Sequence, residues 1–368
     1  MDFDRFWKEN ALCLARPFST DKPRAGLTIG LDDHWLFGEM APVSTLRCYA
    51  DPDYRLDLCK RCNDRVEKGI GLRPFVERPS PPPPRIEMLF GCRFEYTEGS
   101  TPWLVPGAEG EKGKKSEKGV KDEKSVKAFE RVLDRAEGTS LMEFFLPAEF
   151  QRGWEENGGG RLGGGSRGPA TIGTCVCGTE QYLTWLIDEP EMMERFHRLL
   201  GYAIVERDRI LREFSGNTSA GFGFLDDNCC LLSPALYERF CLPVLDAVFS
   251  AFSPDASDRR FQHSDSAMGH LMPLLRRVGL NGANFGPEVA IEQIRRELPN
   301  AMIYGQIPPF LLMRGTREEI EQCVKHDFEI AGRTGHLVVT TSGSVSCGTS
   351  IERLRWLMEI VDEHTRYD

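Results

Sequence analysis

From Gly168 onward, the chain alternates short apolar runs with longer segments of helical period. The apolar runs are rich in β-branched or aromatic residues, and recognisable helix starts follow them. Ser233 and Pro234 supply an N-cap and a first-turn proline, and Thr316-x-x-Glu319 forms a capping box. This alternation predicts β/α units and therefore a parallel sheet. The expected strands are Ala170–Val176, Gly221–Leu225, Arg260–His263, Gly282–Phe285, Met302–Ile307 and His336–Thr341.

Six such units make up most of a (β/α)₈ barrel, which would close if two more strands came from the first part of the chain. Candidate apolar runs there are Ile86–Phe90, Met142–Leu146 and Gly26–Leu31. We therefore expect one α/β domain, a (β/α)₈ TIM barrel over residues 1–368. Residues 1–168 would form an irregular N-terminal part, and residues 169–368 would carry the regular repeats. An open doubly wound sheet is the alternative that the pattern leaves.

Two stretches of the N-terminal part have the composition of flexible loops. Residues 105–127 contain many charges of both signs, and residues 156–168 are rich in glycine. The glycine-rich stretch lacks the pattern of a phosphate-binding loop. We expect flexible loops at both places.

Composition and charge narrow the class of protein. The formal net charge of -10 argues against non-specific nucleic-acid binding, which needs a basic surface. No apolar run approaches the roughly 18 residues that span a bilayer, and the charged start MDFDRFWKEN is unlike a signal peptide. We expect a cytoplasmic protein that does not bind membranes. Its cysteines, including the pairs Cys59/Cys62, Cys175/Cys177 and Cys229/Cys230, are expected to be reduced and to pack as small apolar residues rather than to bind zinc.

Five successive expected strands finish in polar or ionisable residues, without the Lys and Glu that solubility alone would favour. Because reacting groups in a barrel lie where strands end, these residues predict a substrate pocket. They are Asp226, Asp227, His263, Asp265, Asn284, Gln306 and Ser342. Adjacent Asp226 and Asp227 would point to opposite faces of an extended segment, so only one can readily face the pocket.

His263 is the strongest single candidate in this pocket. It ends an apolar strand, and Asp265 follows two residues later. A histidine there can serve as a general acid/base or a metal ligand, and a hydrogen bond to a neighbouring loop is the alternative. Cys347, in the last expected loop, offers a soft metal ligand.

An ordered set of segments resembles the uroporphyrinogen decarboxylase superfamily, which also contains corrinoid-dependent methyltransferases. The segments are RGPATIGTCVCGTEQYLTWLIDEPEMMERF, FLDDNCCLLSPALYERFCLPVL, QHSDSAMGHLMPLLRRVGLNGANFGP, YGQIPPFLLMRGTREEIEQCV and GSVSCGTSIERLRWLMEIV. The resemblance spans about Gly168 to Val361, and more loosely Glu87 to Trp103. It implies a (β/α)₈ barrel whose pocket lies at the C-terminal ends of the strands.

The two branches of that superfamily differ in motifs that can be compared with this chain. The decarboxylase branch grips its tetrapyrrole with an arginine-rich N-terminal motif, whereas Arg16 and Arg24 are isolated here. The methyltransferase branch typically binds zinc through a His-x-Cys pair and a later Cys. His263 matches that histidine, Asp265 stands at the first Cys position, and Cys347 lies a few residues beyond the second. Because a carboxylate can bind zinc, the resemblance implies a zinc site of His263 and Asp265, with or without Cys347.

The leading hypothesis from this resemblance is a demethylase that passes a methyl group from a small molecule to a corrinoid (cobalamin) protein. Asp227 or Asp265 would orient or protonate the leaving group, and His263 would bind a metal or donate a proton. An open apolar rim would accept substrate and then the corrinoid, and its residues would be Phe145, Leu146, Phe285, Ile307 and Phe310. The alternatives are a cofactor-free decarboxylase of a porphyrinogen or other electron-rich ring and a non-catalytic small-molecule-binding barrel. A homodimer is compatible with all three.

Overall fold

A computed structural model of the chain describes residues 1–77, 82–107 and 123–367. One parallel sheet organises it, with strand order β1-β9-β8-β7-β6-β5-β4. Its strands are β1 (Gly26–Leu27), β4 (Gly165–Arg167), β5 (Phe222–Leu225), β6 (Arg260–Ser264), β7 (Gly282–Phe285), β8 (Met302–Tyr304) and β9 (Leu337–Val339). A separate antiparallel hairpin is formed by β2 (Arg93–Glu95) and β3 (Trp103–Val105).

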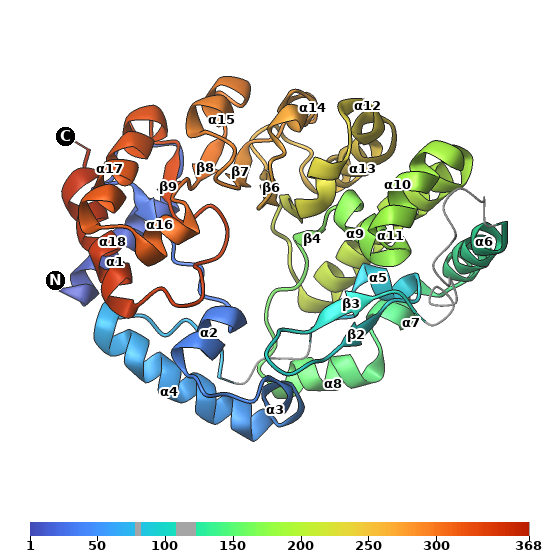
Figure 1. The fold of residues 1–368 in the computed structure, drawn as a ribbon, viewed down its shortest axis with the longest axis horizontal. Coiled ribbons are helices and arrows are strands. Elements are labelled where there is room, and N and C mark those ends of the chain that lie inside the picture. Colours follow the sequence, from blue (N-terminus) through green and yellow to red (C-terminus); the bar gives the residue numbers. More distant parts are fainter. Residues whose placement is uncertain (78–81, 108–122, 368) are drawn as a thin grey trace.

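Helices surround the sheet (Figure 1). Those of the N-terminal part are α1 (Phe3–Ala15), α2 (Asp33–Glu39), α3 (Thr45–Ala50), α4 (Pro52–Ile70), α5 (Ile86–Leu89), α6 (Glu123–Glu137), α7 (Leu141–Phe145) and α8 (Ala148–Glu156). Those between and after the later strands are α9 (Pro169–Cys177), α10 (Thr179–Asp188), α11 (Pro190–Ser215), α12 (Pro234–Leu236), α13 (Leu242–Phe252), α14 (Met272–Arg277), α15 (Ile291–Glu297), α16 (Pro309–Arg314), α17 (Arg317–Asp327) and α18 (Ile351–His364). Two 3₁₀ turns, Asp227–Leu231 and Gly269–Leu271, and two π-helical turns, Tyr237–Cys241 and Phe328–Gly332, complete them. In Figure 1 the β/α units curve around one side of a ring, and α2, α3, α4 and α8 lie along the other.

The strand order is that of a barrel. The strands from β4 to β9 are neighbours in chain order, and β1 then pairs with β9 rather than with β4. The chain therefore returns to its first strand after passing around the sheet. In a doubly wound sheet, by contrast, the order in which the chain adds strands reverses near the middle of the sheet. The doubly wound alternative is wrong. Of the three candidate runs in the N-terminal part, only Gly26–Leu31 contributes a strand, β1, to this sheet. Within the described residues, β1 and β4 remain the edges of the sheet.

The alternation along β5 separates its two faces. Phe222 and Phe224 are fully buried. Phe222 stacks on Phe252 of α13 at a centroid distance of 5.7 Å, and Phe224 packs edge-to-face on Phe249 of the same helix at 5.5 Å. Because successive strand residues point to opposite faces, Gly223 faces the inside of the barrel. The sequence predicted this strand, and those at β6, β7, β8 and β9, with boundaries that differ by a few residues at most.

Three predicted strands are wrong, because their apolar runs form short helices. Ala170–Val176 lies in α9, Ile86–Phe90 covers α5, and Met142–Leu146 overlaps α7. A short apolar run satisfies the pattern of a buried strand and that of a buried helix equally well. Pro169 marks the first case: it occupies the first turn of α9, where its missing N–H costs nothing. The strand of that unit is β4, just before it.

The two predicted flexible loops have different outcomes. Within 105–127, residues 108–122 lie outside the described residues, and α6 begins at Glu123. The glycine-rich stretch 156–168 is not all loop, since Gly165–Arg167 forms β4 and pairs with β5. Cys59 and Cys62 are fully buried on α4, as expected of small apolar residues. Among the helices of the described residues, none has both the length and the apolar character needed to cross a bilayer.

Candidate active site

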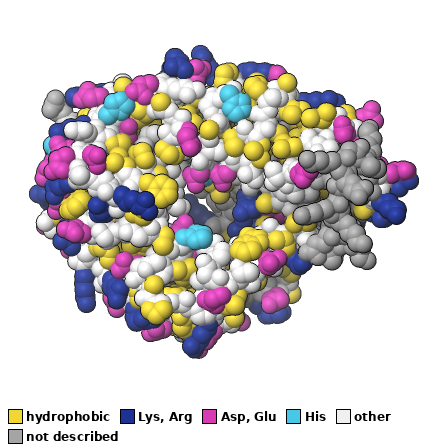
Figure 2. All heavy atoms as spheres, viewed as in Figure 1, with side chains coloured by type: hydrophobic (Ala, Val, Ile, Leu, Met, Phe, Trp, Pro, Cys, Tyr) yellow, Lys and Arg dark blue, Asp and Glu magenta, His cyan; other side chains and the backbone are white. Residues whose placement is uncertain are grey.

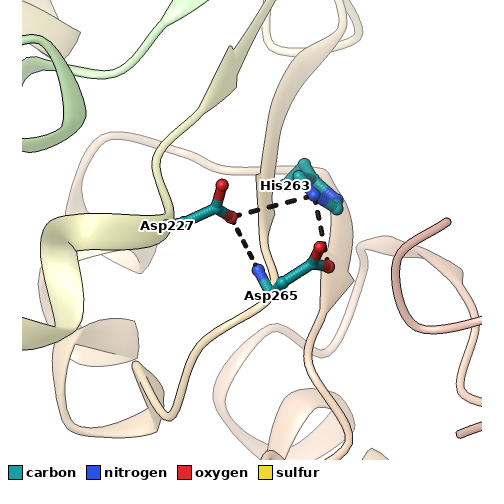
Figure 3. Close-up of side chains that lie close together, drawn as sticks. All are labelled: Asp227, His263 and Asp265. Carbon is teal, nitrogen blue, oxygen red and sulfur yellow. Dashed lines mark hydrogen bonds and ion pairs between the residues drawn. The ribbon is translucent and has the colours of Figure 1, made fainter. Parts of the chain in front are cut away.

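Asp227, His263 and Asp265 meet where β5 and β6 end (Figure 3). Asp227 begins the 3₁₀ turn that follows β5, His263 is near the end of β6, and Asp265 is the first residue after it. Parallel pairing brings these positions together, because Leu225 of β5 is the register partner of His263. The carboxyl ends of adjacent strands thus place three ligand-type side chains at one edge of the sheet.

The three side chains form a compact group. His263 Nε2 lies 3.3 Å from Asp265 Oδ1 and 3.8 Å from Asp227 Oδ1. The backbone N–H of Asp265 also donates to Asp227 Oδ1 at 2.8 Å, which ties the two loops together. The His263 side chain is 18% exposed, whereas those of Asp227 and Asp265 are 48% and 51% exposed. The imidazole therefore lies at the base of the group, and the carboxylates face the opening.

Asn284 determines which nitrogen of His263 carries a proton. The Nδ2 group of Asn284 donates to the backbone carbonyls of Tyr304 and Thr341, so its Oδ1 is left as an acceptor. His263 Nδ1 lies 2.6 Å from that Oδ1 and must be the donor. In the neutral ring, the lone pair is then on Nε2 and points toward both aspartates. An outer hydrogen bond of this kind is what orients a metal-binding histidine.

Two opposing influences act on the pKa of His263. Burial disfavours the imidazolium and lowers the pKa. The hydrogen bonds to Asp265 and Asn284 and the negative charges of Asp265 and Asp227 outweigh burial, so the pKa of His263 is raised above its ordinary value. Without a metal, protonated Nε2 is a donor held next to two carboxylates. Protons compete with a metal ion for the same lone pair, so metal affinity should rise with pH through this pKa.

The chemistry of the donor set fits a divalent metal ion. One imidazole nitrogen and two carboxylate oxygens lie within 4.8 Å of one another. Zinc accepts both donor types, and a three-ligand protein site leaves a position for substrate. Cys347 does not join this group: its side chain is exposed, and its Sγ lies against Gly38 of α2. The sequence predicted Asp227 as a catalytic residue and not as a metal ligand. In the structure, Asp227 and not Cys347 is the third member of the donor group.

The other predicted pocket residues, apart from Asn284, are buried away from this opening. Asp226 is fully buried and accepts a 2.8 Å hydrogen bond from the backbone N–H of Thr171 in α9, so the expectation that one of the adjacent aspartates faces elsewhere is confirmed. Gln306 Nε2 donates to the backbone carbonyls of Gly286 and Val289, and Ser342 Oγ donates to that of Ile307. These three residues hold the scaffold together and, in this conformation, are not available to a substrate.

The expected open apolar rim is also wrong in most of its members. Phe145, Phe285 and Ile307 are fully buried in the core, and Phe145 packs beneath Arg207. Phe310 is the exposed one, at 66%. The sequence shows that such residues are apolar but not on which side of a strand or short helix they lie.

Arg167, at the end of β4, was missed because the strand was predicted at Ala170–Val176, after the position that it has in the structure. It is the register partner of Leu225, which pairs with His263, so all three belong to one inward-facing layer. Its Nη1 is 3.4 Å from Oε1 of the buried Glu87. Acidic and basic side chains both border the hollow at the centre of Figure 2. The start of α9 at Pro169 is the signal that would have placed Arg167 at a strand end.

Replacing Asn284 by alanine should weaken zinc binding, because His263 loses the acceptor that orients its ring. We expect a loss of about 10–100-fold in affinity, typical of an outer hydrogen bond to a metal ligand. Competition with a chromophoric chelator measures it. Asn217→Ala, in the loop after α11, is the matched control because the Asn217 side chain bonds to Ser219 of that loop and to the Leu162 carbonyl, away from the site. Equal affinity in the wild type and Asn284→Ala would show that Asn284 does not orient the ligand.

Comparison with known proteins supplies a family match and matches to solved structures. The family model described as uroporphyrinogen decarboxylase (URO-D) matches residues 86–364. Among solved structures, a methyltransferase from Methanosarcina mazei superposes with a TM-score of 0.59 at 15% sequence identity, covering 96% of each chain. At that identity the likeness shows a shared fold. No curated protein matches the sequence.

Proposed function

The chain belongs to the uroporphyrinogen decarboxylase family, and from that premise we propose that it is a metal-dependent methyltransferase. It would move a methyl group from a small molecule to a corrinoid carried by a partner protein. The observation that carries the proposal is the Asp227–His263–Asp265 group, whose donor atoms converge at the strand ends. Catalytic groups in this fold are drawn from that end of the barrel.

The N-terminal arginines support the methyl-transfer branch over the decarboxylase branch. Arg24 is fully buried, donates to Asn10 Oδ1 and the Ala25 carbonyl, and approaches Asp362. Arg16 is exposed and pairs with Asp21. Neither is arranged to grip the several carboxylates of a tetrapyrrole, each of which would need a paired cation. The fold likeness to a methyltransferase agrees with this preference.

The site residues divide the work. His263, Asp227 and Asp265 would hold the metal, which when bound supplies a Lewis acid that polarises the heteroatom losing its methyl group. Asn284 keeps the Nε2 lone pair of His263 directed at the site. The two carboxylates offset the charge of a divalent ion, so that an uncharged methyl-bearing group can approach without electrostatic penalty. Gly343, with φ +105°, lets the loop after β9 pass against Asp265 and restrict its side chain.

The proposal predicts a metal-dependent change in the cobalamin spectrum. Zinc-loaded protein would be mixed with cob(I)alamin and a panel of O-, N- and S-methylated small molecules, and also with methylcobalamin and thiols. We expect at least one donor or acceptor to interconvert cob(I)alamin and methylcobalamin, and exhaustive chelation to stop the reaction. Retained metal without any spectral change across the panel would count against methyl transfer.

A decarboxylase is the second candidate, and Arg167 is the observation that favours it. Its position in the strand directs the Cβ to the inside of the barrel in the layer of His263, where a substrate carboxylate would compete with Glu87 for the guanidinium. Asp227 or Asp265 would then stabilise the protonated ring from which the carboxylate leaves. Turnover of a porphyrinogen that survives chelation and needs no cobalamin would select this candidate.

A further inference from the structure

The inside of this barrel is not filled in the usual way. Barrel interiors are normally packed with layers of branched side chains. Here Gly165 of β4 is the register partner of Gly223, Gly223 of Phe261, and Phe261 of Gly282. Register partners share a face, so three of these four inward positions carry no side chain. The glycines leave room in the lumen below the layer of His263.

Arg259, just before β6, extends into this room. A Cβ at Gly223 would lie 3.0 Å from Arg259 Nη1, so the absence of a side chain there accommodates the guanidinium. The guanidinium stacks 4.3 Å from the centroid of Phe261. The surrounding atoms lower the pKa of Arg259, yet the residue remains exposed, so solvent still reaches its charge. Within the described residues, its side chain has neither an ion pair nor a hydrogen bond.

A cavity of about 280 Å³ joins Arg259 to the candidate active site. It is lined by Thr28, Arg259, Phe261, Asn284, Tyr304, Thr340, Thr341 and Gly343. No aspartate or glutamate is among these described residues. The side-chain hydroxyls of Tyr304, Thr28 and Thr340 have no hydrogen-bond partner within the described residues. At its upper end, Asn284 bonds to His263 and Gly343 touches Asp265.

These features form an anion site rather than ordinary core packing. The guanidinium of Arg259 is exposed at the cavity wall and has no counter-charge among the described residues, so it can pair with an incoming anion. A ligand carboxylate would pair with the planar guanidinium and accept hydrogen bonds from the hydroxyls. An engineered cavity of about 150 Å³ holds benzene, so this one has room for a small organic acid.

We propose that the lumen cavity binds the carboxylate of a small organic acid, with Arg259 as its counter-ion and Tyr304 as an additional donor. This part of the inference rests on the proposed function: the reacting end of the same molecule would lie at Asp227, His263 and Asp265. The substrate is then an elongated acid whose methyl-bearing end and carboxylate are at opposite ends. The anion site itself needs neither metal nor cobalamin.

Binding of benzoate to metal-free protein tests this inference, with neutral benzamide as the matched ligand. Calorimetry should show benzoate binding at least about tenfold more tightly than benzamide, because a charge-assisted bond contributes about 1.5–3 kcal/mol. Arg259→Gln should remove that preference, and Arg296→Gln, which alters an exposed arginine on α15, should keep it. Tyr304→Phe should weaken benzoate several-fold and leave benzamide unchanged.

The outcomes separate a binding role from a structural one. Without ligand, Arg259→Gln should unfold close to the wild-type temperature, since Arg259 is exposed and has no ion pair among the described residues to lose. If Arg259→Gln does not fold, two other measurements test whether the site binds a carboxylate. Tyr304→Phe should weaken benzoate binding, and high salt should remove the preference of the wild type for benzoate over benzamide. Equal binding of benzoate and benzamide, or an unchanged preference in both variants, would overturn the proposal. Tighter binding of inorganic phosphate or benzenesulfonate than of benzoate would refute a carboxylate. Benzoate preference without any cobalamin activity would keep the anion site and reject methyl transfer.

Discussion

Replacing His263 by alanine should abolish zinc binding and, with it, methyl transfer to cobalamin. His263 supplies the nitrogen of the donor set, and its Nε2 faces both Asp227 and Asp265. Without it, two half-exposed carboxylates remain, and they also repel each other. Since losing an outer hydrogen bond already costs about 10–100-fold, we expect loss of the ligand itself to cost more than about a hundredfold in zinc affinity. Metal analysis after dialysis and chelator competition measure this loss.

The control for His263→Ala is His326→Ala. His326 lies on α17 and pairs with Glu292, so its replacement removes an imidazole without touching the site. Circular dichroism should show that both variants keep the wild-type fold. Wild-type zinc content in His263→Ala would mean that the group at the ends of β5 and β6 does not bind the metal.

The fold could be predicted from the sequence wherever an apolar run was flanked by unambiguous helix starts. The Thr316–Glu319 capping box forms in the structure, and Ser233 caps α12 through Leu236. Prediction failed where the run was short and its flanks were glycine or proline, as at Ala170–Val176. There the deciding fact is local: Pro169 suits the first turn of a helix. The place of β1 beside β9 depends on contacts between the two ends of the chain, which no local pattern encodes.

The centre of the site was predictable for a different reason. Parallel strands end at one edge, so Asp227, His263 and Asp265 could be grouped before any coordinates were known. Which side of the backbone each residue takes could not. Asp226 and Gln306 are next to pocket positions yet point into the scaffold, and Cys347 is held away by the path of its loop. Arg259 precedes β6, and functional residues of a barrel are expected at the C-terminal ends of its strands, so the sequence did not indicate this residue.

Asp226→Asn should stabilise the protein at alkaline pH and progressively less as the pH falls. Burial raises the pKa of Asp226 to about 7, against hydrogen bonds from Thr171 and Ala170 that lower it, while the charge of Asp227 raises it further. The unfolded carboxyl titrates near 4. Between these values the folded state binds more protons than the unfolded state, so stability falls as pH rises from about 4 to about 7 and is then constant.

Asparagine keeps the size and the acceptor oxygen of Asp226 but cannot ionise. The NH₂ group of asparagine would replace Oδ2 of Asp226, which has no hydrogen-bond partner. Any loss of stability from this unpaired NH₂ group is the same at every pH. The difference between variant and wild type therefore isolates ionisation. At 1.36 kcal/mol per pKa unit, it should grow by about 3 kcal/mol in favour of asparagine between pH 5 and pH 8.

Urea unfolding of metal-free protein at both pH values measures this difference. Asp246→Asn, which alters an exposed carboxylate on α13, should leave the pH dependence unchanged. A parallel shift of Asp226→Asn at pH 5 and pH 8 would show that Asp226 is already ionised in the folded protein at pH 5. A buried charge of that kind would need a cation or ordered water at Oδ2. The expected slope instead means that the buried carboxyl next to Asp227 stays neutral up to about pH 7.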